Sequence, residues 1–268
     1  MSEPGELILH LPTDPNPEQV VAALTDAFRT RAEDAHYQSL ISTAVPGISP
    51  TYGIRVPALR EMAKEILRKY KNQTAALQNV AQESWSTGTR EHKLVALFIF
   101  DGQKDLAPEN RWTIGIRFLP DVGNWEECDQ LCMAMFGRVI IESPSVMDEL
   151  ERWIQDPNFW VRRAALVTTV YLRNGKFDDE EATDLDARAL AMCAALLDDD
   201  EKYIRKAVDW TIRAVIARHD QLAYKWMMEQ SKPGLTSSGR STLKLASKKL
   251  SEQNQEAFLK KLETSSAT

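Results

Sequence analysis

Two six-residue stretches decide the fold of this chain: Trp160-Val-Arg-Arg-Ala-Ala165 and Tyr203-Ile-Arg-Lys-Ala-Val208. They match residue type for residue type and lie 43 residues apart. That period is typical of HEAT and armadillo repeats, in which each unit is built from packed helices. A weaker third copy is Arg90-Glu-His-Lys-Leu-Val-Ala96. Because each unit buries one face on its neighbour, the repetition predicts a helical solenoid with a concave surface.

The rest of the chain favours the same all-α class. Apolar residues recur at helical spacing in nearly every segment, and no hairpin signal or run of alternating strands occurs. Short polar connectors such as Asp121-Val-Gly-Asn124 separate the segments. We expect one HEAT-like domain over residues 17–263, with a flexible N-terminal tail at 1–16 and a C-terminal tail at 264–268. The helices are expected at residues 17–30, from 57 onward, 90–100, 112–118, 125–141, 146–155, 159–172, 185–197, 201–218, 222–230, 240–250 and 253–262.

The charge of the chain is unevenly distributed. The formal net charge of −6 argues against a generic nucleic-acid binder. However, residues 176–201 hold ten acids against two cations, whereas residues 225–250 hold six cations against one acid. Phosphate binding depends on a local basic face rather than on the total charge. A nucleic-acid partner is therefore compatible with the composition, although a charge run is more often only a solvated face.

Several classes of protein are excluded by what the sequence lacks. It has no apolar run long enough to span a bilayer, and its acidic, polar start is no signal peptide. The three cysteines, Cys128, Cys132 and Cys193, are too few for a disulfide framework, which favours the reducing cytoplasm. No Cys/His pattern or glycine-rich loop is present, so we expect no metal and no nucleotide cofactor. The histidines are expected on the surface or satisfied in the core: His10, His36, His92 and His219.

The helix expected at 201–218 carries two stripes of side chains. An apolar stripe faces the core: Ile204, Val208, Ile212 and Val215. The second stripe is Tyr203, Lys206, Trp210 and Arg213. At roughly 100° per residue, Trp210 lies about 120° or more from every member of the apolar stripe. A tryptophan with a cation one turn before and after it fits an anionic partner with flat parts, such as nucleic acid. Val167 occupies the equivalent repeat position, so the scaffold itself needs no tryptophan there.

A second candidate lies at Trp125-Glu-Glu-Cys-Asp129, where Asn124 is a plausible N-cap. Trp125 and Asp129 are one turn apart on the same face. An aromatic face beside a carboxylate would stabilise a cationic base or a positively charged sugar in a transition state. Alternatively, Trp125 extends the apolar stripe Cys128, Cys132, Met135 and Val139 into the core, and Asp129 is a surface acid paired with an arginine. Glu126 and Glu127 are interpreted as a solvated helix start.

Four motifs, in their order along the chain, resemble the AlkD-type alkylpurine DNA glycosylases of the DNA alkylation repair family. They are Thr51-Tyr-Gly-Ile-Arg-Val-Pro-Ala-Leu-Arg60, Asn124-Trp-Glu-Glu-Cys-Asp129, Phe159-Trp-Val-Arg-Arg-Ala-Ala165 and Lys206-Ala-Val-Asp-Trp-Thr-Ile-Arg213. The likeness runs from about residue 51 to 250. It implies a HEAT-like solenoid that holds duplex DNA in its concave, basic face. It also implies hydrolysis of the N-glycosidic bond of cationic alkylated purines, such as N3-alkyladenine and N7-alkylguanine, by a monofunctional enzyme of base excision repair.

The resemblance also assigns roles to individual residues. Asp129 becomes the catalytic carboxylate, and Trp125 and Trp210 contact the sugar of the lesion. Arg163 matches a backbone-contacting arginine and Arg213 matches an arginine that follows the second tryptophan, and we assign both to DNA binding. We add to the DNA-binding set Tyr203, Lys206, Arg240 and Lys244. We expect Trp210 to face Trp125 across a groove with Asp129 between them, and the protein to act as a monomer. Two alternatives stay open, namely a non-catalytic binder of damaged or branched DNA and a HEAT-type protein-interaction scaffold.

Overall fold

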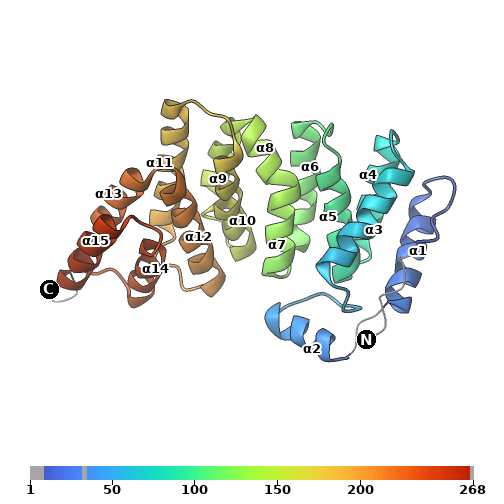
Figure 1. Ribbon diagram of the computed structural model, residues 1–268, viewed down its shortest axis with the longest axis horizontal. Helices are drawn as coiled ribbons and strands as arrows, with labels where there is room; N and C mark the ends of the chain where they lie inside the picture. Colours follow the sequence, from blue (N-terminus) through green and yellow to red (C-terminus); the bar gives the residue numbers. More distant parts are fainter. Residues whose placement is uncertain (1–8, 32–34, 266–268) are drawn as a thin grey trace. The chain divides into compact units, whose positions relative to one another are not determined.

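A computed structural model describes residues 9–31 and 35–265, with the side chains of residues 35 and 36 left aside. Within these ranges the chain consists of helices and their connections, without any β-strand (Figure 1). The all-α helical-repeat class predicted from the sequence is therefore confirmed. The chain divides into two compact units, residues 1–135 and 136–268. The expectation of one domain over 17–263 stays a prediction, because consecutive units of a repeat protein can form a single domain.

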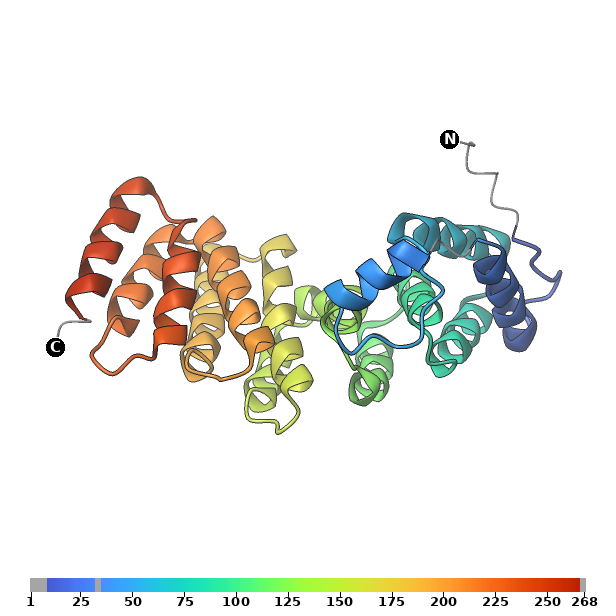
Figure 2. The ribbon, with the colours of Figure 1, turned by 90° about the horizontal axis from the view of Figure 1, so that it is seen from below.

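The first unit contains seven α-helices in its described part. Helix α5 is its buried centre, since residues 90–100 are all covered, and helices α3 and α4 pack against it. Helix α1 packs on α4, and α7 packs on α5. Figures 1 and 2 show α2 beside the loop that leads into α3. The helices are α1 (Pro17–Thr30), α2 (Ala35–Ala44), α3 (Val56–Lys69), α4 (Thr74–Ser86), α5 (Arg90–Gly102), α6 (Pro108–Phe118) and α7 (Trp125–Leu131), and a short 3₁₀ turn η1 (Leu119–Asp121) follows α6.

The second unit is built around helix α12. The helices packed directly against it are α10, α11, α13 and α14. Figure 2 shows these helices as neighbouring rods within the unit. The helices are α8 (Gly137–Glu142), α9 (Met147–Trp153), α10 (Phe159–Thr169), α11 (Asp179–Ala195), α12 (Lys202–Arg218), α13 (Asp220–Gln230), α14 (Ser237–Ser247) and α15 (Glu252–Thr264), with the 3₁₀ turns η3 (Pro144–Val146) and η4 (Val170–Asn174).

The two strong sequence repeats occupy equivalent helices that touch in register. The ring of Trp160 at the start of α10 packs on that of Tyr203 at the start of α12, with ring centroids 5.1 Å apart. The equivalent arginines make equivalent contacts. Arg162 donates to the carbonyls of Asp156 (2.8 Å) and Pro157 (3.2 Å). Arg205 donates to the equivalent carbonyls, those of Asp199 (3.4 Å) and Asp200 (2.6 Å). In each helix the arginine therefore ties the preceding connector to the first turn.

Some of the expected elements differ from the observed ones. Helices α2 and α4 were not expected, because both carry weak apolar periodicity, and α4 also begins without a side-chain cap. The helix expected over 125–141 is interrupted by a π-helical turn, Cys132–Phe136, which separates α7 from α8. Such turns insert one residue into a helix and often occur at functional sites. The turn follows directly after the helix that carries Trp125 and Asp129.

Residues 9–16, assigned to the flexible tail, are held by the first unit. Leu9 is buried, and the carbonyls of Leu11 and Pro12 accept hydrogen bonds from Lys69 (2.7 Å) and Tyr70 (2.7 Å). That part of the expectation is corrected, since these contacts fix the segment. Residues 1–8 of the same tail, and residues 266–268 at the other end, lie outside the described residues.

Candidate functional site

The start of α7 presents the expected pair of side chains at the surface. The side-chain oxygen of Asn124 accepts from the backbone N–H of Glu127 (3.0 Å), so the predicted N-cap is confirmed. Trp125 and Asp129 follow one turn apart, and both are partly exposed. The indole N–H of Trp125 donates to the carbonyl of Ala44 at the end of α2 (2.9 Å). Trp125 is therefore outside the core, with its polar edge engaged and its ring held against the neighbouring segment.

The apolar stripe that could have included Trp125 is nevertheless present. Cys128, Cys132, Met135 and Val139 are all buried. Trp125 is the member that does not join them, because it lies in the first turn of α7, at the surface of the unit. Of the two readings of Trp125 that the sequence left open, the surface reading is therefore the one observed.

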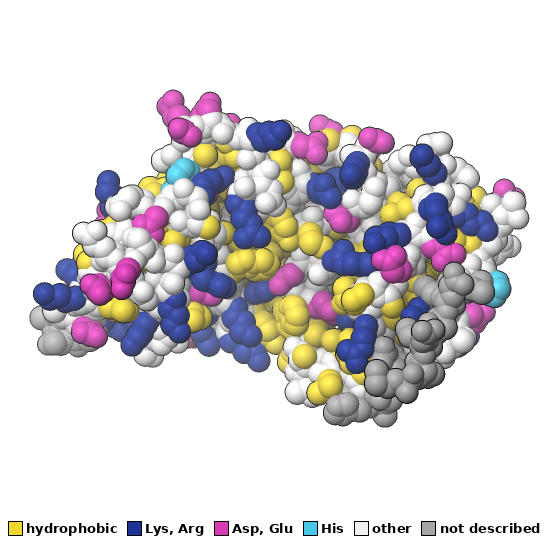
Figure 3. Space-filling model, in the orientation of Figure 1, with side chains coloured by type: hydrophobic (Ala, Val, Ile, Leu, Met, Phe, Trp, Pro, Cys, Tyr) yellow, Lys and Arg dark blue, Asp and Glu magenta, His cyan; other side chains and the backbone are white. Residues whose placement is uncertain are grey.

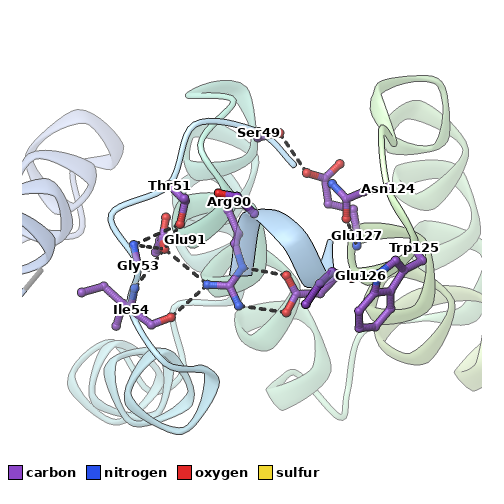
Figure 4. A network of polar contacts seen from close by, with 12 residues as sticks. Ser49, Thr51, Gly53, Ile54, Arg90, Glu91, Asn124, Trp125, Glu126 and Glu127 are labelled. Carbon is purple, nitrogen blue, oxygen red and sulfur yellow. Dashed lines mark hydrogen bonds and ion pairs between the residues drawn. The ribbon is translucent and has the colours of Figure 1, made fainter. Parts of the chain in front are cut away.

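A buried ion pair fixes the second residue of α7. Arg90, at the start of α5, makes a bidentate contact with Glu126 through Nε (2.6 Å) and Nη2 (2.8 Å), and both side chains are buried (Figure 4). Burial lowers the pKa of Arg90, but the hydrogen bond and charge of Glu126 outweigh it and the net pKa is raised. The interpretation of Glu126 as a solvated acid is therefore wrong, because α5 supplies a cation of matching geometry.

Glu127 is also buried rather than solvated. One of its oxygens accepts from the hydroxyl of Ser49 (2.9 Å), and the other accepts from Lys93 Nζ (3.1 Å) and from the backbone N–H of Gly123 (3.1 Å). The carboxylate thus joins α5, the connector before α7 and the loop after α2 (Figure 4). The helix start that carries Trp125 is fixed from three sides.

A third acid, Glu91, organises the loop that opens the first motif. Its carboxylate accepts from the hydroxyl of Thr51 (2.7 Å) and from the backbone N–H groups of Tyr52, Gly53 and Ile54 (3.0, 3.0 and 3.1 Å) (Figure 4). A carboxylate that accepts several backbone N–H bonds holds a loop in one conformation. The loop 49–54, α5 and the start of α7 are therefore one connected structure.

Sequence reasoning missed this network, and the one related sequence feature, the repeat, shows its meaning only in the structure. In the weaker third copy of the repeat, Lys93 aligns with Arg163. Both are buried cations that donate to a backbone carbonyl, Lys93 to that of Asp121 (3.0 Å) and Arg163 to that of Tyr203 (2.6 Å). A cation at this repeat position thus serves packing between helices.

Two of the residues assigned to DNA binding are buried. Arg163 is 4% exposed and its guanidinium donates to Tyr203, so it joins α10 to α12 and does not offer its charge at the surface. Tyr203 is 8% exposed and packs on Trp160. The exposure expected of both residues is corrected, because Trp160 packs on Tyr203 and α12 covers Arg163, a position that the repeat leaves free in its last copy. There, the equivalent residue Lys206 is exposed.

The remaining members of the second stripe lie at the surface as expected. Trp210 is partly exposed, whereas Val167, its equivalent in the preceding repeat, is fully buried. Lys206 and Arg213, one turn on either side of Trp210, are exposed. The arrangement of Trp210 opposite Trp125 and Asp129 stays a prediction.

A groove between α12 and α14 gathers cations on this surface. It has a volume of about 420 Å³. A neighbouring hollow of about 350 Å³ shares Asp209 and Leu245 with it. Figure 3 shows Lys and Arg side chains concentrated over α12 and α14. The groove is lined by Lys202, Arg205, Lys206, Asp209, Ser237, Ser238, Ser241, Thr242 and Leu245, and the hollow adds Arg213, Lys248 and Lys249.

Two further cations, from the cation-rich residues 225–250, differ in how far they are available to an anionic partner. Lys244, on α14, is exposed and lines a third hollow. Arg240 lines the same hollow, but its guanidinium donates to the carbonyls of Leu262 (3.0 Å) and Ser265 (2.8 Å). These bonds satisfy the last turn of α15, which is a common use of an arginine near a helix C-terminus. Lys244 is thus the better placed of the two for an anionic partner.

Neither a cluster of candidate metal ligands nor a helix able to span a membrane is present in the described part of the chain. Residues 9–31 and 35–265 contain no group of three His, Cys, Asp or Glu side chains that could hold a metal ion. The same residues include no helix with the length and apolarity needed to cross a bilayer. The three cysteines are buried.

Comparison with known proteins agrees with the motifs. The family model of DNA alkylation repair enzymes matches residues 25–250. Among solved structures, one described as a predicted DNA alkylation repair enzyme from Enterococcus faecalis is similar with a TM-score of 0.62. The two share 18% sequence identity over 78% of this chain and 94% of that one, so this likeness speaks for the fold. A comparison with curated proteins yields no match.

The match of the family model spans most of the sequence and includes all four motifs, together with Trp125, Asp129 and Trp210. The chain belongs to the DNA alkylation repair enzyme family, with a role in the repair of alkylated DNA.

Proposed function

We propose that this protein is a DNA glycosylase that hydrolyses the N-glycosidic bond of cationic alkylated purines in duplex DNA. Its substrates on this proposal are N3-alkyladenine and N7-alkylguanine. The observation that carries the proposal is the surface pair on α7, in which the ring of Trp125 and the carboxylate of Asp129 are partly exposed one turn apart. Family membership supports a role in alkylation repair and leaves the reaction to be tested.

The chemistry needs little from the protein beyond this pair. An alkylated purine already carries a positive charge, so it leaves as a neutral base when the bond between its nitrogen and the sugar C1′ breaks. The positive charge then develops on the sugar. A carboxylate and an aromatic face both stabilise such a cation, and they do so most strongly in the transition state.

Asp129 would have two tasks in this reaction. Its negative charge would stabilise the developing oxocarbenium ion, and its oxygen would accept a proton from the water that attacks C1′. Trp125 would offer its ring face, since its N–H is bound to Ala44. The buried contacts of Glu126 and Glu127 hold the start of the helix in place, which favours catalysis because no reorganisation is needed when charge develops.

The basic groove between α12 and α14 suits the DNA backbone. Lys206 and Arg213 flank Trp210, and Lys244 extends the cationic surface along α14. Cations that neutralise phosphates release condensed counterions, and this supplies much of the affinity for DNA. Trp210 would contact the lesion-bearing strand between these cations.

The test is release of free N7-methylguanine from methylated duplex DNA. Replacing Asp129 with Asn keeps the shape of the side chain and removes its charge, so we expect a loss of about a hundredfold or more in excision. DNA affinity should stay within about threefold, since a single partly exposed acid contributes little to phosphate binding. Asp105→Asn, at an exposed acid in a connector of the same unit, is the matched control. Unchanged excision in Asp129→Asn would remove Asp129 from the mechanism.

The same experiment separates the alternatives. A non-catalytic DNA binder would bind the duplex with a steep salt dependence yet release no base from it. A protein-interaction scaffold would show no measurable duplex affinity even at low salt. Affinity together with base release supports the glycosylase.

A further inference from the structure

One acid lies in the middle of the cationic surface between α12 and α14. Asp209 lines both the groove and the adjoining hollow, and it is the only acid among the residues that line the two. The other charged groups there are all cations: Lys202, Arg205, Lys206, Arg213, Lys248 and Lys249. A surface suited to phosphate thus contains one charge of the wrong sign, next to Trp210.

Asp209 is buried and only half satisfied. The residue is 6% exposed, and its Oδ2 pairs with Nη2 of Arg213 at 3.0 Å. Its other oxygen, Oδ1, is buried without a hydrogen-bond partner. A buried carboxylate oxygen without a donor destabilises the charged form. Desolvation accordingly raises the pKa of Asp209, although Arg213 acts in the opposite direction.

The charged residues that line the groove and the hollow around Asp209 come from α12 and from α14 with the residues that directly follow it. On the other helices packed against α12, the buried charged groups have partners of their own. Arg163 of α10 bonds to Tyr203, and Asp186 of α11 bonds to Arg218 and His219. At the start of α13, Asp220 accepts from Ser251 and Asn254. The charge state of Asp209 therefore depends on Arg213 and on whatever enters the groove.

We propose that the groove between α12 and α14 receives a phosphodiester of the DNA strand, and that Asp209 takes up a proton from solvent when it does. The inference rests on the proposed DNA-binding function and adds a ligand site and a proton linkage to it. Lys202 and Lys206 supply positive charge from one wall. Hydroxyl groups of Ser237, Ser238 and Ser241 supply donors from the other.

The physical reason for the proton is repulsion. A phosphodiester carries a full negative charge, and like charges at close range in a partly desolvated site disfavour each other's ionised form. A neutral carboxylic acid removes the repulsion and releases Arg213 from its ion pair, so that the guanidinium can turn to the phosphate. By linkage, a ligand that favours the protonated form binds more tightly as the pH falls.

The test is the pH dependence of affinity for an undamaged duplex, measured by fluorescence anisotropy at constant ionic strength. Between about pH 8 and about pH 5 we expect the dissociation constant of the native protein to fall by on the order of tenfold, as for one linked proton. Asp209→Asn keeps the side-chain shape and the contact with Arg213 but cannot titrate. It should bind more tightly than the native protein at the upper end of this range and lose most of the pH dependence.

The matched control is Asp184→Asn, which removes the same charge from an exposed position on α11 outside the groove. It should retain the native pH dependence. Proton uptake is measured independently by calorimetry of duplex binding in two buffers of different ionisation enthalpy. The native protein should take up protons, and Asp209→Asn should take up fewer.

The outcomes separate the inference from the function on which it rests. If the native protein has no affinity for the duplex at low salt, the proposed function fails. If it binds but Asp209→Asn shows the same pH dependence and proton uptake, or binds more weakly at the upper pH, DNA binding stands and the linkage to Asp209 is overturned. Circular dichroism of both variants shows whether the fold is retained.

Discussion

The indole N–H of Trp125 donates to the carbonyl of Ala44 at 2.9 Å, across 81 residues of sequence. This bond makes the segment after α2 part of the candidate site, because it determines which part of the tryptophan is available. The N–H is engaged, so a ligand meets the ring face. It also means that the position of Trp125 depends on the loop 45–49, which begins directly after Ala44.

A substitution of Gly47 tests whether the position of Trp125 depends on this loop. Its φ of +78° is unfavourable for other residues, and a Cβ at this position would lie 2.7 Å from the carbonyl oxygen of Gly123, just before α7. We expect Gly47→Ala to push the loop away from α7, lowering stability by roughly 2–4 kcal/mol and lowering excision as well. Urea denaturation and base release measure the two effects.

Gly88 provides a matched control for that prediction. It has a similar φ of +73°, but a Cβ there would meet no atom within 4 Å. Gly88→Ala therefore carries only the backbone strain of about 1–2 kcal/mol and should leave excision unchanged. Equal effects of the two substitutions would show that the approach to Gly123 is unimportant.

We expect Trp210 to contribute more to DNA binding than to the stability of the fold. It is partly exposed, whereas Trp153 of the same unit is 8% exposed and packs on Phe136 with ring centroids 5.2 Å apart. We expect Trp153→Ala to lower the free energy of unfolding by about 3–5 kcal/mol. Trp210→Ala should cost about 1–2 kcal/mol of stability but weaken affinity for lesion-containing DNA by on the order of tenfold, as for a lost stacking contact. A larger stability loss for Trp210→Ala than for Trp153→Ala would identify Trp210 as a core residue.

The sequence predicted the fold well because the relevant signals are local. Apolar spacing, caps such as Asn124 and the repeat period each depend on neighbouring residues, and α1 and α12 begin within one residue of the expected positions. The buried ion pairs could not be predicted from the sequence, because Arg90 and Glu126 lie 36 positions apart and nothing in their local sequence indicates the contact. From its local sequence, Glu126 was interpreted as an acid that stabilises the first turn of a helix. It does lie in the first turn of α7, but buried against Arg90.

The candidate site was predicted in part for the same reason. Face and spacing placed Asp129, Lys206 and Trp210 at the surface and left Trp125 open between the core and the surface. They could not reveal that Arg163 would be covered, because burial there depends on which helix packs next. The last repeat has α14 beyond it, and at that position Lys206 stays exposed. Sequence equivalence within a repeat thus does not guarantee equivalent exposure.

His92 should make stability depend on pH. It is 2% exposed, its ring nitrogens lie near the hydroxyls of Thr25 (3.1 Å) and Thr89 (2.6 Å), and burial lowers its pKa below the usual 6.5. Below pH 6.5 the unfolded chain therefore binds a proton that the folded protein resists. The contribution of neutral His92 is complete above that pH and is lost as the pH falls toward the lowered value. In urea denaturation, the native protein should lose stability on acidification more steeply than His92→Gln, and parallel curves would exclude this role.

The cations of the second unit should differ in their effect on the salt dependence of DNA binding. Lys206 and Lys244 are exposed beside the groove, so each alanine substitution should remove one phosphate contact. The slope of log affinity against log salt should then fall by about 0.9 for each. Arg188 is the control, because its guanidinium is paired with Asp148 (2.5 Å) and Glu151 (2.7 Å) and offers no unpaired charge. Arg188→Ala should leave the slope unchanged. A slope that Lys206→Ala and Lys244→Ala also leave unchanged would place the DNA on a different surface of the unit.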